Sequence, residues 1–130
     1  MLVLEHALAA PMPVRAGEWA ERVVESLRRL RAAFAEHIMV TEGPDGLYQD
    51  ILGSTPRLAC AVGRLHGEHV EMSAILDALV GEAATVDGSP ERVMGLRERA
   101  YRLLGQLVRH RQRGADLVFE AYETDIGGET

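Results

Sequence analysis

The stretch that decides the fold reads LVRHRQRGADL and spans residues 107–117. It lies within a longer row of apolar or small residues at alternating spacings of four and three, namely Leu96, Ala100, Leu103, Leu107, Gly114, Leu117 and Ala121. This spacing predicts a long helix with one side facing a core. His110 fills the remaining position of the row, so we expect an imidazole where a leucine would normally be buried.

Two other segments carry the same feature. One row consists of Val23, Leu27, Leu30, Phe34, His37 and Thr41, and another of Leu58, Val62, Leu65, His69, Met72, Leu76 and Leu79. Both rows follow helical spacing. Three predicted long helices therefore each direct one histidine, His37, His69 or His110, at the interior, and this coincidence indicates a metal site.

Prolines and glycines set the expected helix boundaries. The decisive positions are Pro11 and Pro13, Gly43-Pro44, Thr55-Pro56, Ser89-Pro90 and Gly127-Gly128. Proline cannot continue a helix but suits its first turn, and glycine suits the position after its end. They predict a short helix over residues 1–10 and long helices over about 17–42, 55–83 and 89–123. The linker 43–55 is expected to lay one helical turn over the end of the bundle.

Sustained strand alternation is absent from the sequence, so the chain is predicted to be all-α. We expect an up-down helical bundle of three long helices plus a short N-terminal helix, which is an incomplete four-helix bundle. Residues 1–130 would form one domain. Apolar residues on more than one side of the last helix predict a homodimer: Leu117, Val118, Phe119, Ala121 and Tyr122.

Composition excludes several classes of protein. The formal net charge of −6 argues against a general nucleic-acid binder. No apolar run is long enough to cross a membrane, and the N-terminus does not read as a secretory signal. Cys60 is the single cysteine, which rules out a disulfide framework and a thiolate zinc cluster. A cytoplasmic location is expected.

The order of the histidines resembles that of the hemerythrin-like, or HHE cation-binding, family. The chain has Glu5-His6, Glu36-His37, Glu68-His69 and a late Arg109-His110 on successive predicted helices. The resemblance covers most of the chain and implies four helices around non-haem iron. It implies that His6, His37, His69 and His110 correspond to the histidine ligands of the four helices. Such a protein would sense or buffer oxygen, nitric oxide or iron, so a small diatomic ligand is expected.

The sequence departs from that family at the carboxylates. Thr41 and Gly114 stand where the family usually has glutamate. The nearest acids, Glu42 and Asp116, are rotated about 140° and 120° from their histidines on an ideal helix. They are secondary ligand candidates that would require the helix ends to unwind. Because two irons need bridging carboxylates, a di-iron centre is doubtful, and three or four imidazoles suit one Zn²⁺, or one Fe²⁺ with a borrowed carboxylate.

Two further interpretations stay open. The chain could be a metal-free helical interaction or dimerisation module descended from a hemerythrin-like fold, or, more weakly, a redox enzyme of peroxide or nitric oxide chemistry. No nucleophile arrangement of serine or cysteine with histidine is found, so an enzyme is not the preferred interpretation. Glu36 and Glu68 are candidates to orient imidazoles, and His66 is expected at the surface. Counting residues from Asp87 predicts that His69 and His110 differ in height by on the order of 9 Å.

Overall fold

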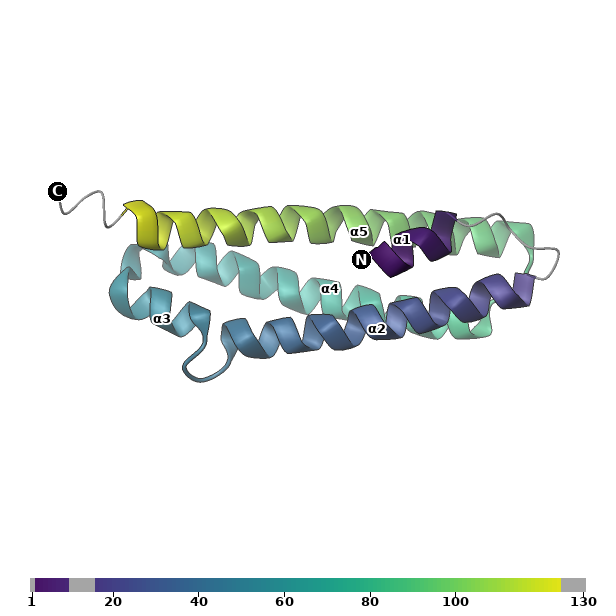
Figure 1. Ribbon diagram of the computed structural model, residues 1–130, viewed down its shortest axis with the longest axis horizontal. Coiled ribbons are helices and arrows are strands. Elements are labelled where there is room, and N and C mark those ends of the chain that lie inside the picture. Colours follow the sequence, from purple (N-terminus) through teal and green to yellow (C-terminus); the bar gives the residue numbers. More distant parts are fainter. Residues whose placement is uncertain (1, 10–15, 125–130) are drawn as a thin grey trace.

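A computed structural model describes residues 2–9 and 16–124 of the chain. Its elements are α1 (Leu2–Ala9), α2 (Ala16–Glu42), α3 (Leu47–Ser54), a 3₁₀ turn (Pro56–Leu58), α4 (Ala59–Thr85), α5 (Pro90–Val118) and a π-helical extension (Phe119–Thr124). The helices α2, α4 and α5 lie alongside one another, and the shorter α1 packs against α2 (Figure 1). Every regular element of the described ranges is helical, which confirms the predicted all-α bundle of three long helices and a short N-terminal helix.

The predicted helix ends lie close to the observed ones. Gly43 donates its backbone N–H to the Met39 carbonyl at 3.0 Å and closes the last turn of α2. A Cβ at Gly43 would lie 2.5 Å from the Met39 carbonyl oxygen, so glycine is required there. At the other end of the bundle α5 begins at Pro90, and Val93 donates to the Ser89 carbonyl at 3.0 Å. The expected boundaries at Pro11, Pro13 and residues 125–128 fall outside the described residues.

Two clusters of buried apolar side chains form the core. The larger joins α1, α2, α4 and α5: Leu4, Leu8, Trp19, Ala20, Val23, Leu27, Phe34, Met72, Leu76, Leu79, Val80, Ala83, Val93, Leu96, Ala100, Leu103, Leu104 and Leu107. The smaller joins α3 to the far ends of α4 and α5: Tyr48, Ile51, Leu58, Val62, Leu65, Leu117 and Ala121. The linker therefore does place a short helix over the bundle end, and it is longer than the single turn expected.

The histidine rows cross the core between these clusters. Along α4, His69 lies between Leu65 of the smaller cluster and Met72 of the larger one. Along α5, His110 lies between Leu107 and Leu117 in the same way. A polar layer thus separates two apolar regions.

The surface carries some apolar side chains. Leu117 and Ala121 are buried within the chain, whereas Phe119 next to them is 62% exposed. Of the apolar residues on which the homodimer prediction rests, some therefore belong to the core of the chain and others lie on its surface. In the part of the chain that the structure describes, no helix has the length and hydropathy needed to cross a membrane.

Candidate metal centre

Three histidines from three helices meet in the polar layer. Nε2 of His69 lies 3.0 Å from Nε2 of His110, which lies 3.4 Å from Nε2 of His37. One nitrogen of each ring lies within 4.8 Å of the other two. His69 and His110 are buried, with exposed fractions of 1% and 5%, whereas His37 is exposed. The three interior histidines predicted from the sequence therefore converge, although His37 lies at the edge of the core.

These separations suit a shared cation. Zn²⁺–nitrogen bonds are about 2.0–2.1 Å long, so two imidazole nitrogens on one ion lie about 2.9 Å apart at 90° and about 3.3 Å apart at tetrahedral angles. The observed 3.0 and 3.4 Å fall at those values. The third pair of ligand nitrogens, on His37 and His69, lies within 4.8 Å. The arrangement can hold one metal ion.

Carboxylates fix the outer nitrogens of the two buried rings. Nδ1 of His110 lies 2.7 Å from Oε1 of Glu68, and Nδ1 of His69 contacts Oε2 of Glu42. Since an ionised carboxylate only accepts hydrogen bonds, each Nδ1 must be the donor and carry the proton. In the neutral rings, the Nε2 lone pairs of His69 and His110 then face each other across 3.0 Å. This tautomer is the one in which Nε2 binds metals.

The carboxylates are themselves held in place. Glu68 also accepts from Arg113, whose Nη2 lies 2.6 Å from Oε2, and Glu42 also contacts Nδ1 of the exposed His66. Burial opposes ionisation of Glu42, but hydrogen bonds from His69 and His66 still lower the pKa of its carboxyl below the usual value. Similarly, burial is outweighed at Glu68, where hydrogen bonds from Arg113 and His110 lower the carboxyl pKa. Both groups are therefore anionic acceptors.

Burial also favours the neutral form of His37 and His69. It lowers the pKa of His37 below its ordinary value, and the neighbouring imidazoles of His69 and His110 lower it further. The pKa of His69 is lowered mainly by burial, although the hydrogen bond to Glu42 works in the other direction. Neutral imidazole is the form that binds a cation. Without a cation, the two opposed Nε2 lone pairs of His69 and His110 would repel each other.

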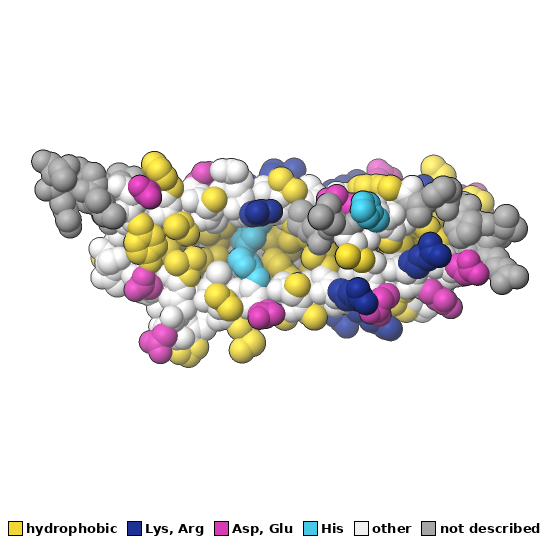
Figure 2. Space-filling model, in the orientation of Figure 1, with side chains coloured by type: hydrophobic (Ala, Val, Ile, Leu, Met, Phe, Trp, Pro, Cys, Tyr) yellow, Lys and Arg dark blue, Asp and Glu magenta, His cyan; other side chains and the backbone are white. Residues whose placement is uncertain are grey.

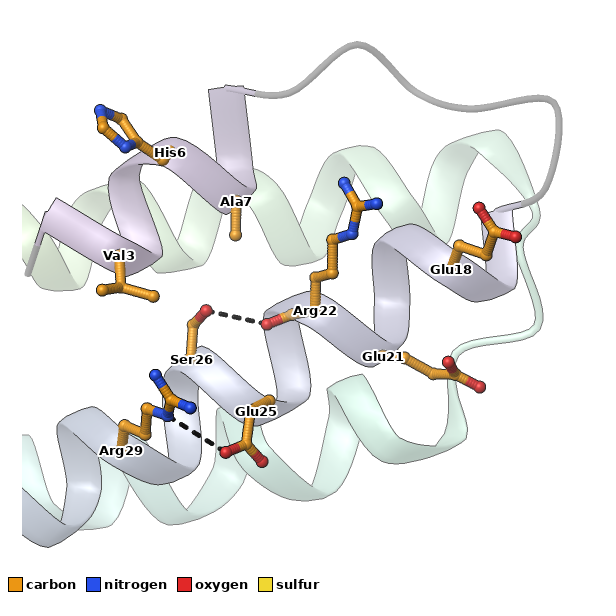
Figure 3. A pocket seen from close by; sticks show the side chains of 9 residues that line it. All are labelled: Val3, His6, Ala7, Glu18, Glu21, Arg22, Glu25, Ser26 and Arg29. Atoms are coloured by element: carbon orange, nitrogen blue, oxygen red, sulfur yellow. Dashed lines mark hydrogen bonds and ion pairs between the residues drawn. The ribbon is translucent and has the colours of Figure 1, made fainter.

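The other ligand candidates lie outside the cluster. His6 is exposed on α1 and lines a surface pocket with Glu18, Arg22 and Glu25, as Figure 3 shows. Asp116 is exposed and accepts from Gln112 at 3.0 Å. Within residues 2–9 and 16–124, no carboxylate joins the three rings on their inner side.

Glu42 needs no unwinding to reach the site. It lies in the last turn of α2 and contacts the outer nitrogen of His69 on α4, away from the facing Nε2 atoms. On α2, Glu42 points in a different direction from His37, and this direction places its carboxylate against α4. Glu68 likewise serves the histidine of another helix, His110, rather than its sequence neighbour.

The predicted height difference between His69 and His110 is wrong. Their Nε2 atoms are 3.0 Å apart, not on the order of 9 Å. Residue counting took no account of the conformation of the connection between α4 and α5, where Val86 and Ser89 are extended and Gly88 has a φ of 83°. An extended chain rises about 3.3 Å per residue. Residues in such conformations advance the chain by more than the roughly 1.5 Å per residue of a helix, so heights counted at the helical rise are not reliable across this connection.

A cavity opens beside the histidines. It has a volume of about 610 Å³ and is lined by Phe34, His37, Thr41, Leu47, Tyr48, Leu107, His110, Arg111, Gly114, Ala115 and Val118. Figure 2 shows histidine side chains at the bottom of a hollow bordered by hydrophobic side chains. Aromatic rings contact the imidazoles, since Phe34 stacks on His37 at 5.9 Å and Tyr48 on His69 at 5.8 Å between centroids. The cluster is therefore accessible from one side.

Comparisons of the chain with protein-family models, curated proteins and solved structures find no match. Membership of the hemerythrin-like family therefore stays a prediction from the sequence. The geometry of the centre is independent of that prediction. Of the four histidines that the resemblance implied as ligands, three lie together and His6 lies elsewhere on the surface.

Proposed function

We propose that this protein binds one divalent metal ion, Zn²⁺ or non-haem Fe²⁺, through Nε2 of His37, His69 and His110. The observation that carries the proposal is the orientation of the two buried rings, His69 and His110. Two Nε2 atoms face each other at 3.0 Å while Glu68 and Glu42 hold the protons of the corresponding Nδ1 atoms. Carboxylate–histidine pairs of this kind typically orient metal ligands.

One ion fits this arrangement better than two. Two hard cations need bridging carboxylates between them. Thr41 donates its hydroxyl to the His37 carbonyl at 2.9 Å, and Gly114 has no side chain to offer. Glu42 and Glu68 lie behind the rings, where they offset the charge of the ion without bridging.

Three protein ligands leave a position for a further ligand. The cavity beside His37 and His110 gives access to that position. Structural zinc sites usually have four protein ligands, whereas three ligands and an open position are typical of sites that bind or transform a small molecule. In line with the resemblance to hemerythrin-like proteins, we propose sensing or buffering of oxygen, nitric oxide or iron as the role of the centre.

Elemental analysis of untagged protein tests metal binding. We expect about one equivalent of zinc or iron per chain, lost in His110→Leu and His69→Leu. His6→Leu serves as the matched control, because His6 is exposed on α1 and should leave the metal content unchanged. Loss of metal in the His6 variant would favour a four-histidine site instead. Absence of stoichiometric metal from wild-type protein supplied with Zn²⁺ or Fe²⁺ would contradict the proposal.

A metal-free interaction module is the second candidate. The observation that favours it is the exposed apolar surface at the end of α5, where Phe119 is 62% and Val118 37% exposed. In that case the facing Nε2 atoms would share a proton, and a homodimer would cover the apolar side chains. Sedimentation of wild type and Phe119→Ser distinguishes the two, since only the second candidate requires the variant to dissociate.

A further inference from the structure

The walls of the cavity beside the histidines are largely apolar. Phe34, Leu47, Leu107, Ala115 and Val118 supply hydrocarbon surface. Pockets for small molecules typically have volumes of roughly 300–1,000 Å³ and combine apolar walls with a few polar groups. At about 610 Å³ this cavity is larger than a diatomic molecule requires.

The charge of the cavity is one-sided. Among the residues that the structure describes, no aspartate or glutamate lines it, and Arg111 is the one permanent cation. Arg111 is exposed and forms no ion pair with any residue in the described ranges. Burial raises the pKa of Tyr48 to about 12, so its hydroxyl stays neutral. A metal held by three neutral imidazoles would add positive charge at the base of the same cavity.

Gly114 keeps the cavity open. It lies one helical turn after His110, and a Cβ placed there would contact nothing within 4 Å. Glycine in the middle of a helix costs about 1 kcal/mol relative to alanine. A longer side chain at this position would extend into the cavity beside the metal ligands.

From these three features we infer that the cavity binds a small organic carboxylate with an apolar body. The carboxylate takes the open position of the metal with Arg111 adding attraction, and the hydrocarbon part lies against Phe34, Leu47 and Val118. This inference rests on the proposed metal site. It deepens that proposal by naming the class of molecule that the open position accepts.

Calorimetric titration tests the inference with straight-chain carboxylates from acetate to octanoate. The protein is first loaded with Zn²⁺ and its metal content is measured. Affinity should rise about fourfold with each methylene that enters the cavity, as expected for burial of hydrocarbon. Octanol should bind much more weakly than octanoate, and metal-free protein should bind neither tightly.

Two pairs of variants separate the contributions. Gly114→Leu should remove the gain with chain length while the metal stays bound, whereas Gly81→Leu, an exposed helical position with equally open space around its Cβ, should behave as wild type. Arg111→Gln should weaken all carboxylates several-fold and to a similar extent. Its matched control is Arg109→Gln, an exposed neighbour that does not line the cavity.

Each other outcome overturns the inference in a recognisable way. Affinity that does not change with chain length, or equal binding of octanol and octanoate, would show that metal is bound but the cavity does not accept this class. Release of a dimer by Gly114→Leu, without carboxylate binding by wild type, would identify a second copy of the chain as the occupant. Failure to take up Zn²⁺ would overturn the proposed function together with this inference.

Discussion

Replacing His110 by leucine should change stability in opposite directions with and without metal. In metal-free protein the imidazole of His110 is 5% exposed and faces a second lone pair at Nε2 of His69. A buried polar group without a good partner costs about 1–3 kcal/mol. Leucine removes that cost, and Glu68 keeps its ion pair with Arg113 at 2.6 Å. We therefore expect His110→Leu to be more stable than wild type by about 1–2 kcal/mol in a chelator.

Metal should reverse this order. A ligand at about 1,000 times its Kd stabilises the folded state by about 4 kcal/mol. With an unfolding entropy of about 2.1 cal/mol/K per residue, a chain of 130 residues changes its Tm by about 4 °C per kcal/mol. In chelator, His110→Leu should then melt about 4–8 °C above wild type. In Zn²⁺, wild type should rise by about 15 °C and the variant should not move.

Differential scanning calorimetry of both proteins, in chelator and in excess Zn²⁺, measures all four values. If leucine only changed the packing of the core, the difference in Tm between His110→Leu and wild type would be the same in chelator and in Zn²⁺. The reasoning would be refuted if Zn²⁺ raised the Tm of wild type and of His110→Leu by the same amount. It would also be refuted if His110→Leu were destabilised in chelator, because the imidazole would then have satisfactory partners without a metal.

Three further outcomes are expected. Glu68→Gln should fold normally but lose about 10–100-fold in Zn²⁺ affinity in a chelator competition, whereas Glu36→Gln, at an exposed position of α2, should not. Burial lowers the pKa of His37 and His69 below the ordinary value of about 6.5, so at lower pH the unfolded chain binds more protons than the folded chain. The free energy of unfolding of metal-free protein, measured by urea titration, should therefore decrease as the pH falls below about 6.5. A free energy of unfolding independent of pH between about 7 and 5 would contradict this. Gly114→Ala should stabilise the chain by about 1 kcal/mol in urea, because its Cβ meets open space and alanine favours the helix.

Residues along one helix could be predicted well from the sequence. The apolar rows placed His69 and His110 in the core because periodicity shows which side of a helix faces its neighbours. His37 follows the same periodicity but is exposed and lines the cavity. Periodicity does not reveal where a neighbouring element stops covering a row.

Contacts between helices could not be predicted in the same way. Glu42 reaches His69 and Glu68 reaches His110 only because α2, α4 and α5 stand at particular heights relative to one another. Those heights depend on the connections, and residue counting could not include the conformation of residues 86–89, where Gly88 has a φ of 83°. A glutamate directly before a histidine was a usable signal at Glu68, but it gave no indication of which ring the carboxylate serves.

The polar layer between the two apolar clusters also restricts how the helices can slide past each other. A slip of α5 along α4 by one turn would press His110 against Leu65 or Met72, the apolar neighbours of His69 in its row. Its ring nitrogen would then be buried without a partner, at a cost of about 1–3 kcal/mol. Leucine rows alone would tolerate such shifted pairings almost equally well. The histidines thus select a single alignment of the bundle, and a chain with leucine at all three positions should be more stable but less uniquely folded.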